Sequence, residues 1–147
     1  MKREEITEVI QDARRERGLT WKQLAETVGR SPVWTAAALL GQMQLSREEA
    51  ERAGEALGLD EQGSALLQTA PTRGESMDTV PVDPTIYRFY ELLLVYGPTW
   101  KALIHEEFGD GIMSAIDFEM SLERQPDPKG DRVKLVMSGK FLPYKKY

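Results

Sequence analysis

The sequence predicts an α+β fold in two parts: a bundle of short helices over residues 1–75, and a small helix-plus-hairpin domain over residues 76–147. Three observations lead to this prediction. The first half repeats helical apolar spacing between glycine stops, residues 70–84 hold three prolines with little periodicity, and apolar residues alternate with others from Ile112 onward. A chain of 147 residues has room for one or two small domains.

The composition is that of a folded protein with an acidic balance. Hydrophobic residues make up 41% and charged residues 29% of the chain, which favours a packed core over disorder. The formal net charge is −5, which argues against broad binding to nucleic acid and gives no attraction to anionic membranes or substrates. A bound anion would therefore need a local cation.

The chain contains no cysteine, which excludes disulfides, thiolate nucleophiles and cysteine-built zinc sites. His105 is the single histidine, so a multi-histidine metal site is also excluded. The charged residues 1–18 lack the apolar segment of a signal peptide, and no apolar run reaches membrane-spanning length. These features predict a cytoplasmic protein with no membrane partner.

Apolar spacing predicts four short helices in the first half and a fifth around Ser64–Gln68. In the first helix, one stripe is formed by Ile6, Val9, Ile10 and Ala13, and Gly18 ends the helix.

The next three helices have recognisable N-terminal caps. Thr20 begins the capping box TWKQ and Ser46 begins the capping box SREE, while Ser31 followed by Pro32 is an N-cap with proline at the first helical position. The apolar residues behind two of these caps are expected to be buried: Leu24, Ala25, Val28, Ala50, Ala53 and Leu57.

The second half is predicted to begin with a linker or extended arm over residues 70–84. Asp83-Pro84 then begins an apolar helix, which Gly97-Pro98 is expected to end. A further helix is predicted from Thr99 to about Phe108, closed by Gly109.

The last third of the chain predicts a β-hairpin. Residues from Ile112 to Glu123 alternate in polarity, QPDPKGD is a turn, and Arg132–Ser138 alternates again. A lone two-stranded hairpin is marginally stable in water, so we expect another chain to complete it.

The helix over residues 86–96 is apolar on two sides yet carries Arg88 and Glu91. On a helical wheel one arc is continuously apolar, and the two charges share the opposite side with Leu92 and Val95. A chain this small can hardly bury both sides alone. A second subunit is therefore expected to cover this helix, with Arg88 and Glu91 in or near the interface.

Two interpretations of this charged pair remain open from the residues alone. The first is a structural ion pair, which is the commoner arrangement. The second is an anion site, in which the planar guanidinium of Arg88 gives direction as well as charge. Ser114 favours the second, because it is the one polar residue on an otherwise apolar strand face, although such a hydroxyl often bonds only a nearby carbonyl.

Other candidate motifs carry less weight. The wheel places His105 beside Lys101, away from the apolar face, so we expect it to face solvent. Residues 20–40 resemble a helix-turn-helix, but the expected recognition helix offers almost no base-reading side chains. Residues 1–75 also carry ten Lys and Arg against thirteen Asp and Glu, so no nucleic-acid partner is expected.

Residues 86–120, IYRFYELLLVYGPTWKALIHEEFGDGIMSAIDFEM, and the ending GKFLPY closely resemble the signature region of cyanase, also called cyanate hydratase or cyanate lyase. The helical first half is similar to the family's N-terminal helix-turn-helix-like bundle, so the resemblance spans essentially the whole chain and is most specific in the second half. Trp100 stands where the family more often has a smaller aliphatic residue, a departure that concerns local packing.

This resemblance implies catalytic roles for Arg88, Glu91 and Ser114. It implies that cyanate and bicarbonate give carbamate and carbon dioxide, and that carbamate then gives ammonia and carbon dioxide. Bicarbonate is then a co-substrate, with no cofactor and no metal. The resemblance also implies a homodecamer of five dimers, in which the C-terminal strands of two subunits interlock and active sites form where several subunits meet.

Overall fold

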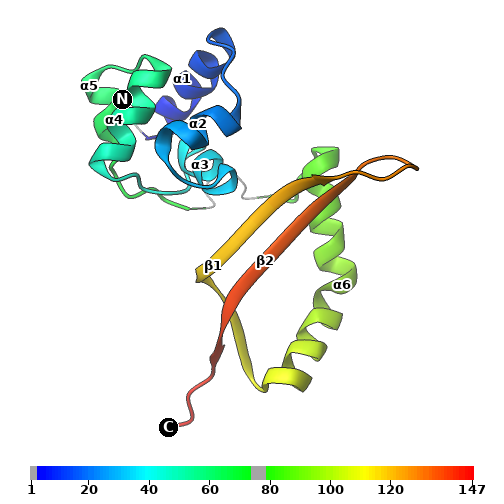
Figure 1. Ribbon diagram of the computed structural model, residues 1–147. Helices are drawn as coiled ribbons and strands as arrows, with labels where there is room; N and C mark the ends of the chain where they lie inside the picture. The colour runs from blue at the N-terminus through cyan, green and yellow to red at the C-terminus, as the bar shows by residue number, and fades with distance from the viewer. Residues whose placement is uncertain (1–2, 74–78) are drawn as a thin grey trace. The chain divides into compact units, whose positions relative to one another are not determined.

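The computed structural model describes residues 3–73 and 79–147, without the side chain of Glu4. Its elements are α1 (Arg3–Glu16), α2 (Trp21–Val28), α3 (Pro32–Leu39), α4 (Arg47–Leu57), α5 (Glu61–Leu66), α6 (Pro84–Phe108), β1 (Gly111–Gln125) and β2 (Arg132–Pro143) (Figure 1). This is the predicted α+β order of helices followed by a two-stranded antiparallel sheet.

Two compact units can be distinguished, and each is described by itself. One contains α1–α5 together with the outer hairpin residues Ser121–Leu135, and the other contains α6 and the rest of the hairpin. The predicted domain boundary between residues 75 and 76 lies outside the described residues. Within the described ranges, no helix is both long and apolar enough to cross a membrane.

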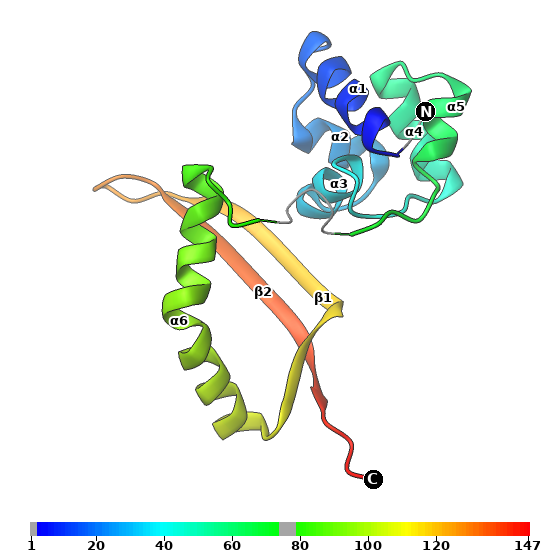
Figure 2. The same cartoon turned by 180° about the vertical axis from the view of Figure 1, so that it is seen from behind.

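Helices α1–α5 pack around one apolar core (Figure 2). α2 contacts α3 and α4, while α1 and α5 both contact α4 and each other. The fully buried side chains include Ile6, Ile10, Leu24, Val28, Leu39, Ala50, Ala53 and Leu57. Most of the predicted apolar faces are therefore confirmed. Val9 is the exception, being 42% exposed, because it lies at the edge of the stripe that Ile6 and Ile10 turn toward the core.

Both predicted capping boxes are present. The backbone N–H of Gln23 donates to Thr20 Oγ1 at 3.1 Å, and the N–H of Thr20 donates to Gln23 Oε1 at 2.8 Å. Ser31 caps α3 as predicted. The fifth helix begins three residues earlier than expected, because the carboxylate of Asp60 accepts the N–H of Gly63 at 2.7 Å and acts as its N-cap.

Glu49 completes the second capping box and also forms an ion pair with Arg30, whose side chain is 55% exposed. Its Oε2 accepts the N–H of Ser46 at 2.8 Å, and its Oε1 accepts from Arg30 Nε at 2.5 Å, while the Glu49 side chain is only 8% exposed. Burial on its own would raise the pKa of this carboxyl. The hydrogen bonds from Ser46 and Arg30 outweigh that effect and hold the pKa of Glu49 below its ordinary value of 4.5.

Replacing Glu49 by glutamine is expected to lower the free energy of unfolding at neutral pH by about 1–2 kcal/mol, because the charged acceptor is lost. A carboxyl with a depressed folded-state pKa contributes stability above pH 4.5 and loses it as the pH falls through the folded value. The difference between native protein and Glu49→Gln should therefore shrink in acid. Urea unfolding followed by tryptophan fluorescence at neutral pH and at about pH 3 measures it.

Glu51→Gln is the matched control, since Glu51 lies in the same helix but is 57% exposed and pairs with the exposed Arg47. It should change stability little at either pH. An equal loss of stability for Glu49→Gln at both pH values would contradict this account of Glu49.

α6 begins as predicted, with Asp83 accepting the N–H groups of Thr85 and Ile86 and Pro84 at the first helical position. The predicted end at Gly97-Pro98 is wrong, because α6 continues through Pro98 to Phe108 as one helix. A residue before proline normally avoids helical conformation because its Cβ clashes with the proline ring. Gly97 has no Cβ, so that part of the clash is absent, while Pro98 still lacks one helical N–H and its ring crowds the carbonyl of Leu94.

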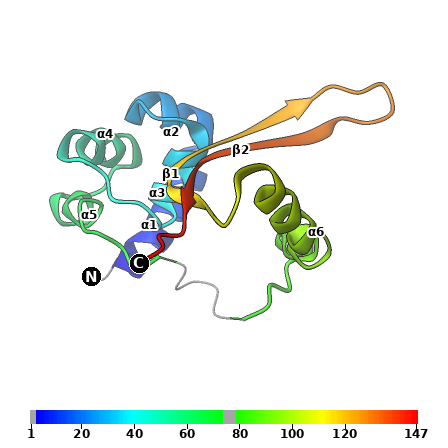
Figure 3. The same ribbon diagram turned by 90° about the horizontal axis from the view of Figure 1, so that it is seen from below.

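The hairpin is confirmed, and β2 extends beyond the predicted Ser138 to Pro143. The N–H of Tyr144 donates to the carbonyl of Asp110 at 3.1 Å, which sets the register at the open end of the hairpin. At the opposite end is the turn over residues 126–131 (Figure 3). Phe108 and Phe141 contact each other with ring centroids 5.2 Å apart.

Much of the apolar surface of α6 and the hairpin is exposed in the single chain. No residue of α6 is buried, and Ile116 on β1 is 99% exposed. Other exposed apolar residues on α6 and the hairpin are Ile86, Phe89, Leu93, Leu94, Val95, Leu122 and Val133. This many large exposed apolar side chains on one helix and one hairpin indicate an interaction site.

Candidate active site

Arg88 and Glu91 lie one turn apart on α6 and form an ion pair. Arg88 Nη1 donates to Glu91 Oε2 at 2.6 Å. The side chains are 65% and 49% exposed, so the pair contributes at most about 1 kcal/mol to stability. The guanidinium carbon of Arg88 also lies 5.7 Å from the ring centroid of Tyr87. Glu91 and Tyr87 therefore orient the Arg88 guanidinium on a stretch of α6, residues 86–96, that carries no other charged side chain.

The sequence left open whether Arg88 and Glu91 pair with each other, and the structure shows that they do. The ion pair uses only part of the hydrogen-bonding capacity of the Arg88 guanidinium. A guanidinium has five N–H donors in a planar fork, and within the described residues only Nη1 of Arg88 has a hydrogen-bond acceptor. The remaining donors can bind an anion while Glu91 holds the group in place.

Ser114 on β1 is buried, with 5% of its surface exposed. Its Oγ accepts the backbone N–H of Ile116 at 3.1 Å and that of Asp117 at 3.0 Å. In a regular strand these two N–H groups would not bond to a side chain of their own strand. β1 is sharply bent along its length (Figure 1). Among the described residues no carbonyl accepts a hydrogen bond from this hydroxyl, and both of its hydrogen bonds come from backbone N–H groups.

The hydrogen-bond pattern of Ser114 leaves its proton available. A serine hydroxyl has two acceptor lone pairs and one O–H donor. Both accepted bonds are to the Oγ, and the described residues provide no acceptor for the O–H. The buried hydroxyl can therefore donate a hydrogen bond. The two hydrogen bonds that its oxygen accepts make the O–H a stronger donor.

The structure brings Arg88 and Glu91 together but leaves Ser114 apart from them. Over the part of the chain that the structure describes, no hydrogen bond joins the Ser114 hydroxyl to either side chain. All three belong to the unit whose apolar surface is uncovered. α6 therefore orients Arg88 and Glu91, and β1 orients Ser114.

A cavity of about 430 Å³ lies between the C-terminal half of α6 and the start of β1. It is bordered by Ile112 and Met113, the two residues before Ser114, and by Tyr144. His105 lines it and is half-buried, so the prediction that this histidine faces solvent is wrong. A helical wheel describes one helix alone and cannot predict this partial burial, because the cavity wall opposite α6 comes from β1 and the C-terminal segment.

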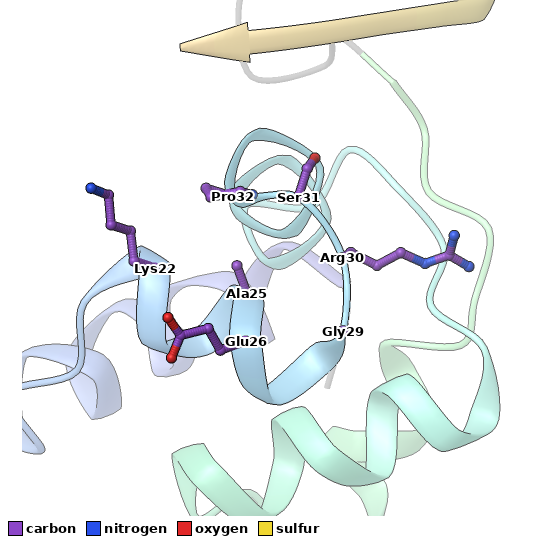
Figure 4. Close-up of a pocket in the computed structure, with 7 residues that line it drawn as sticks. All are labelled: Lys22, Ala25, Glu26, Gly29, Arg30, Ser31 and Pro32. Carbon is purple, nitrogen blue, oxygen red and sulfur yellow. The ribbon is translucent and has the colours of Figure 1, made fainter. Parts of the chain in front are cut away.

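The helix-turn-helix-like region has an open pocket of about 580 Å³ between α2 and the start of α3 (Figure 4). Lys22 and Glu26 border it with opposite charges. Arg30 points away from both in Figure 4 and pairs with Glu49. The pocket therefore lacks a convergent set of donors. Throughout residues 3–73 and 79–147, no three histidine or carboxylate side chains are grouped as metal ligands.

Comparison with known proteins matches both halves of the chain. Residues 3–71 match the family model described as cyanate hydratase, N-terminal, and residues 78–146 match the cyanate lyase C-terminal domain. A cyanate hydratase of Ralstonia pickettii is 62% identical and one of Dechloromonas aromatica 58% identical, each over all of both chains. The crystal structure of cyanase from T. urticae superposes with a TM-score of 0.82 at 39% identity, covering 94% of this chain and 96% of that one.

Proposed function

This chain belongs to the cyanate hydratase family and is a carbon–nitrogen lyase acting on cyanate, and we propose that Arg88, Glu91 and Ser114 carry out the reaction with bicarbonate as the second substrate and no cofactor. The full-length identity of 62% to a cyanate hydratase supports the activity. The assignment of the residues is supported by two separate features: the Arg88 guanidinium is oriented by Glu91, and the buried Ser114 hydroxyl accepts two hydrogen bonds and keeps its own O–H available.

The charge balance of the reaction explains why an arginine is needed. Cyanate and bicarbonate are both monoanions, so their addition product is a dianion. Taking up one proton, the adduct gives carbamate and carbon dioxide, and with a second proton carbamate gives ammonia and carbon dioxide. Bringing two anions together is opposed by Coulomb repulsion unless fixed positive charge is already present.

Arg88 supplies that charge. Its Nη1 is held by Glu91, and its other N–H groups remain available to bind the oxygens of the adduct. Their interaction strengthens as negative charge accumulates, so they stabilise the transition state more than either separate substrate. A matching arginine from a neighbouring protomer would neutralise the second charge.

Ser114 supplies a neutral donor. Because its Oγ accepts two backbone N–H groups, its own O–H is available to donate to an oxygen or nitrogen of the substrate. A buried donor that is already held in place does not have to reorient when negative charge develops beside it, so little free energy is lost to reorganisation.

Glu91 orients Arg88, as the 2.6 Å ion pair indicates. An ionised carboxylate facing a dianion would repel it. Direct contact with substrate would therefore require a protonated Glu91, which could then deliver the proton that the first step consumes.

The complete site is proposed to form between protomers of a decamer built from five dimers, with the strands of two subunits interlocked. The uncovered apolar surfaces of α6 and the hairpin support this assembly. It would also bring Ser114 near an Arg88–Glu91 pair that the single chain does not place against it.

Purified protein is expected to release ammonia from cyanate only when bicarbonate is added. The test measures ammonia with bicarbonate-depleted buffer, with added bicarbonate, and with no protein as the control for spontaneous hydrolysis. Ammonia release at the same rate without bicarbonate would refute bicarbonate as a substrate, and no release in either buffer would refute the activity.

A further inference from the structure

We propose that Gly139 of β2 is a positioning residue for this reaction, because the absence of a side chain there lets β2 approach the backbone of Ser114. The inference rests on the role proposed above for the Ser114 hydroxyl. Gly139 is half-buried and lies opposite Ser114 across the hairpin.

Backbone conformation does not explain a glycine at this position. The glycines with positive φ include Gly109 and Gly130, which end α6 and close the hairpin turn, but Gly139 is not among them. A glycine inside a strand without a special backbone angle points to a close approach by another group.

The close approach is to Ser114 itself. A Cβ built on Gly139 would lie 2.5 Å from the carbonyl oxygen of Ser114 and 2.5 Å from Cγ of Met113. Real Cβ contacts essentially never fall below 3.0 Å, so any side chain here requires a shift of at least half an ångström. The methionine can rotate away, but the Ser114 oxygen is backbone and can move only with the strand.

Moving that segment of β1 moves the proposed donor. The Ser114 hydroxyl is held by the N–H groups of Ile116 and Asp117, so its direction depends on the local backbone path. Catalytic groups tolerate displacements of only about 0.5 Å. Gly139 therefore acts through Ser114 and has no contact with substrate.

Replacing Gly139 by alanine is expected to lower kcat about 10- to 100-fold, with a smaller change in KM, while the oligomer keeps its native mass. Gly54→Ala is the matched control, because its new Cβ would meet Ser64 Oγ in the helical bundle. That variant should lower the Tm without slowing turnover. A Gly139→Ala protein with native kcat overturns the proposal.

A double-mutant cycle separates this inference from the proposed function. Gly139→Ala should reduce kcat/KM, and the affinity for malonate as a stable dianion, in the native background but have almost no further effect in Ser114→Ala. An equal loss in both backgrounds overturns the positioning role and leaves the role of Ser114 intact. Native activity of Ser114→Ala instead refutes the proposed function.

Assembly of the variant is checked with a second substitution. Should Gly139→Ala fail to assemble, Met113→Ala/Gly139→Ala removes the side-chain conflict and keeps the conflict with the Ser114 oxygen. Compared with Met113→Ala alone, it should assemble and show the same loss of kcat. Native turnover, or failure to assemble, would make Gly139 a structural residue and overturn the proposal.

Discussion

Arg88→Lys is expected to lower kcat/KM for cyanate about 10²- to 10³-fold, although the positive charge is retained. In the structure one arm of the guanidinium is occupied by Glu91, and the other donors remain for the anion. A lysine ammonium is a single point of charge on a flexible stem. If the lysine ammonium pairs with Glu91, it has no second pair of coplanar N–H donors to offer to the substrate.

The measurement is ammonia release at saturating bicarbonate and varied cyanate. Arg47→Lys is the matched control, since Arg47 Nε also pairs with a glutamate of its own helix, at 2.8 Å from Glu51 Oε1, and lies in the bundle. It should leave kcat/KM unchanged. Near-native turnover of Arg88→Lys would show that two-pronged anion binding is the wrong description of the site.

Mixed oligomers of Arg88→Gln and Ser114→Ala subunits are expected to show activity well above the residual activity of either parent. In the single chain the Ser114 hydroxyl is not hydrogen-bonded to Arg88, and the surfaces around both elements are uncovered. If a site takes Arg88 from one protomer and Ser114 from another, about a quarter of the sites in a random equal mixture contain both native residues. A site that needs two arginines would be complete about an eighth of the time.

The experiment dissociates the two variants, reassembles them together, and compares ammonia release with that of each variant reassembled alone. Subunits carrying different labels show by mass that mixing has occurred. Inactive oligomers with proven mixing would mean that each protomer supplies its own Arg88 and Ser114, and would refute a shared site.

Residues that act on their immediate neighbours were predicted well from the sequence. The capping boxes at Thr20 and Ser46 are present because their hydrogen bonds join residues three apart. The pairing of Arg88 with Glu91 follows from the same local geometry. The helix predicted around Ser64 begins instead at Glu61, with Asp60 as its N-cap, and this cap is local enough to be recognised in the sequence.

What the sequence determined by itself is the five short helices followed by a hairpin, the caps of α2 to α4, and the placement of Arg88 and Glu91 one turn apart, because these follow from spacing along one element. Tertiary structure decided the rest. The partial burial of His105 depends on β1 and the C-terminal segment, the two hydrogen bonds that Ser114 accepts depend on the local path of β1, and the close approach at Gly139 depends on its distance from the facing strand. Spacing within one element cannot specify these features, since each is set by how closely separate segments of the chain approach one another.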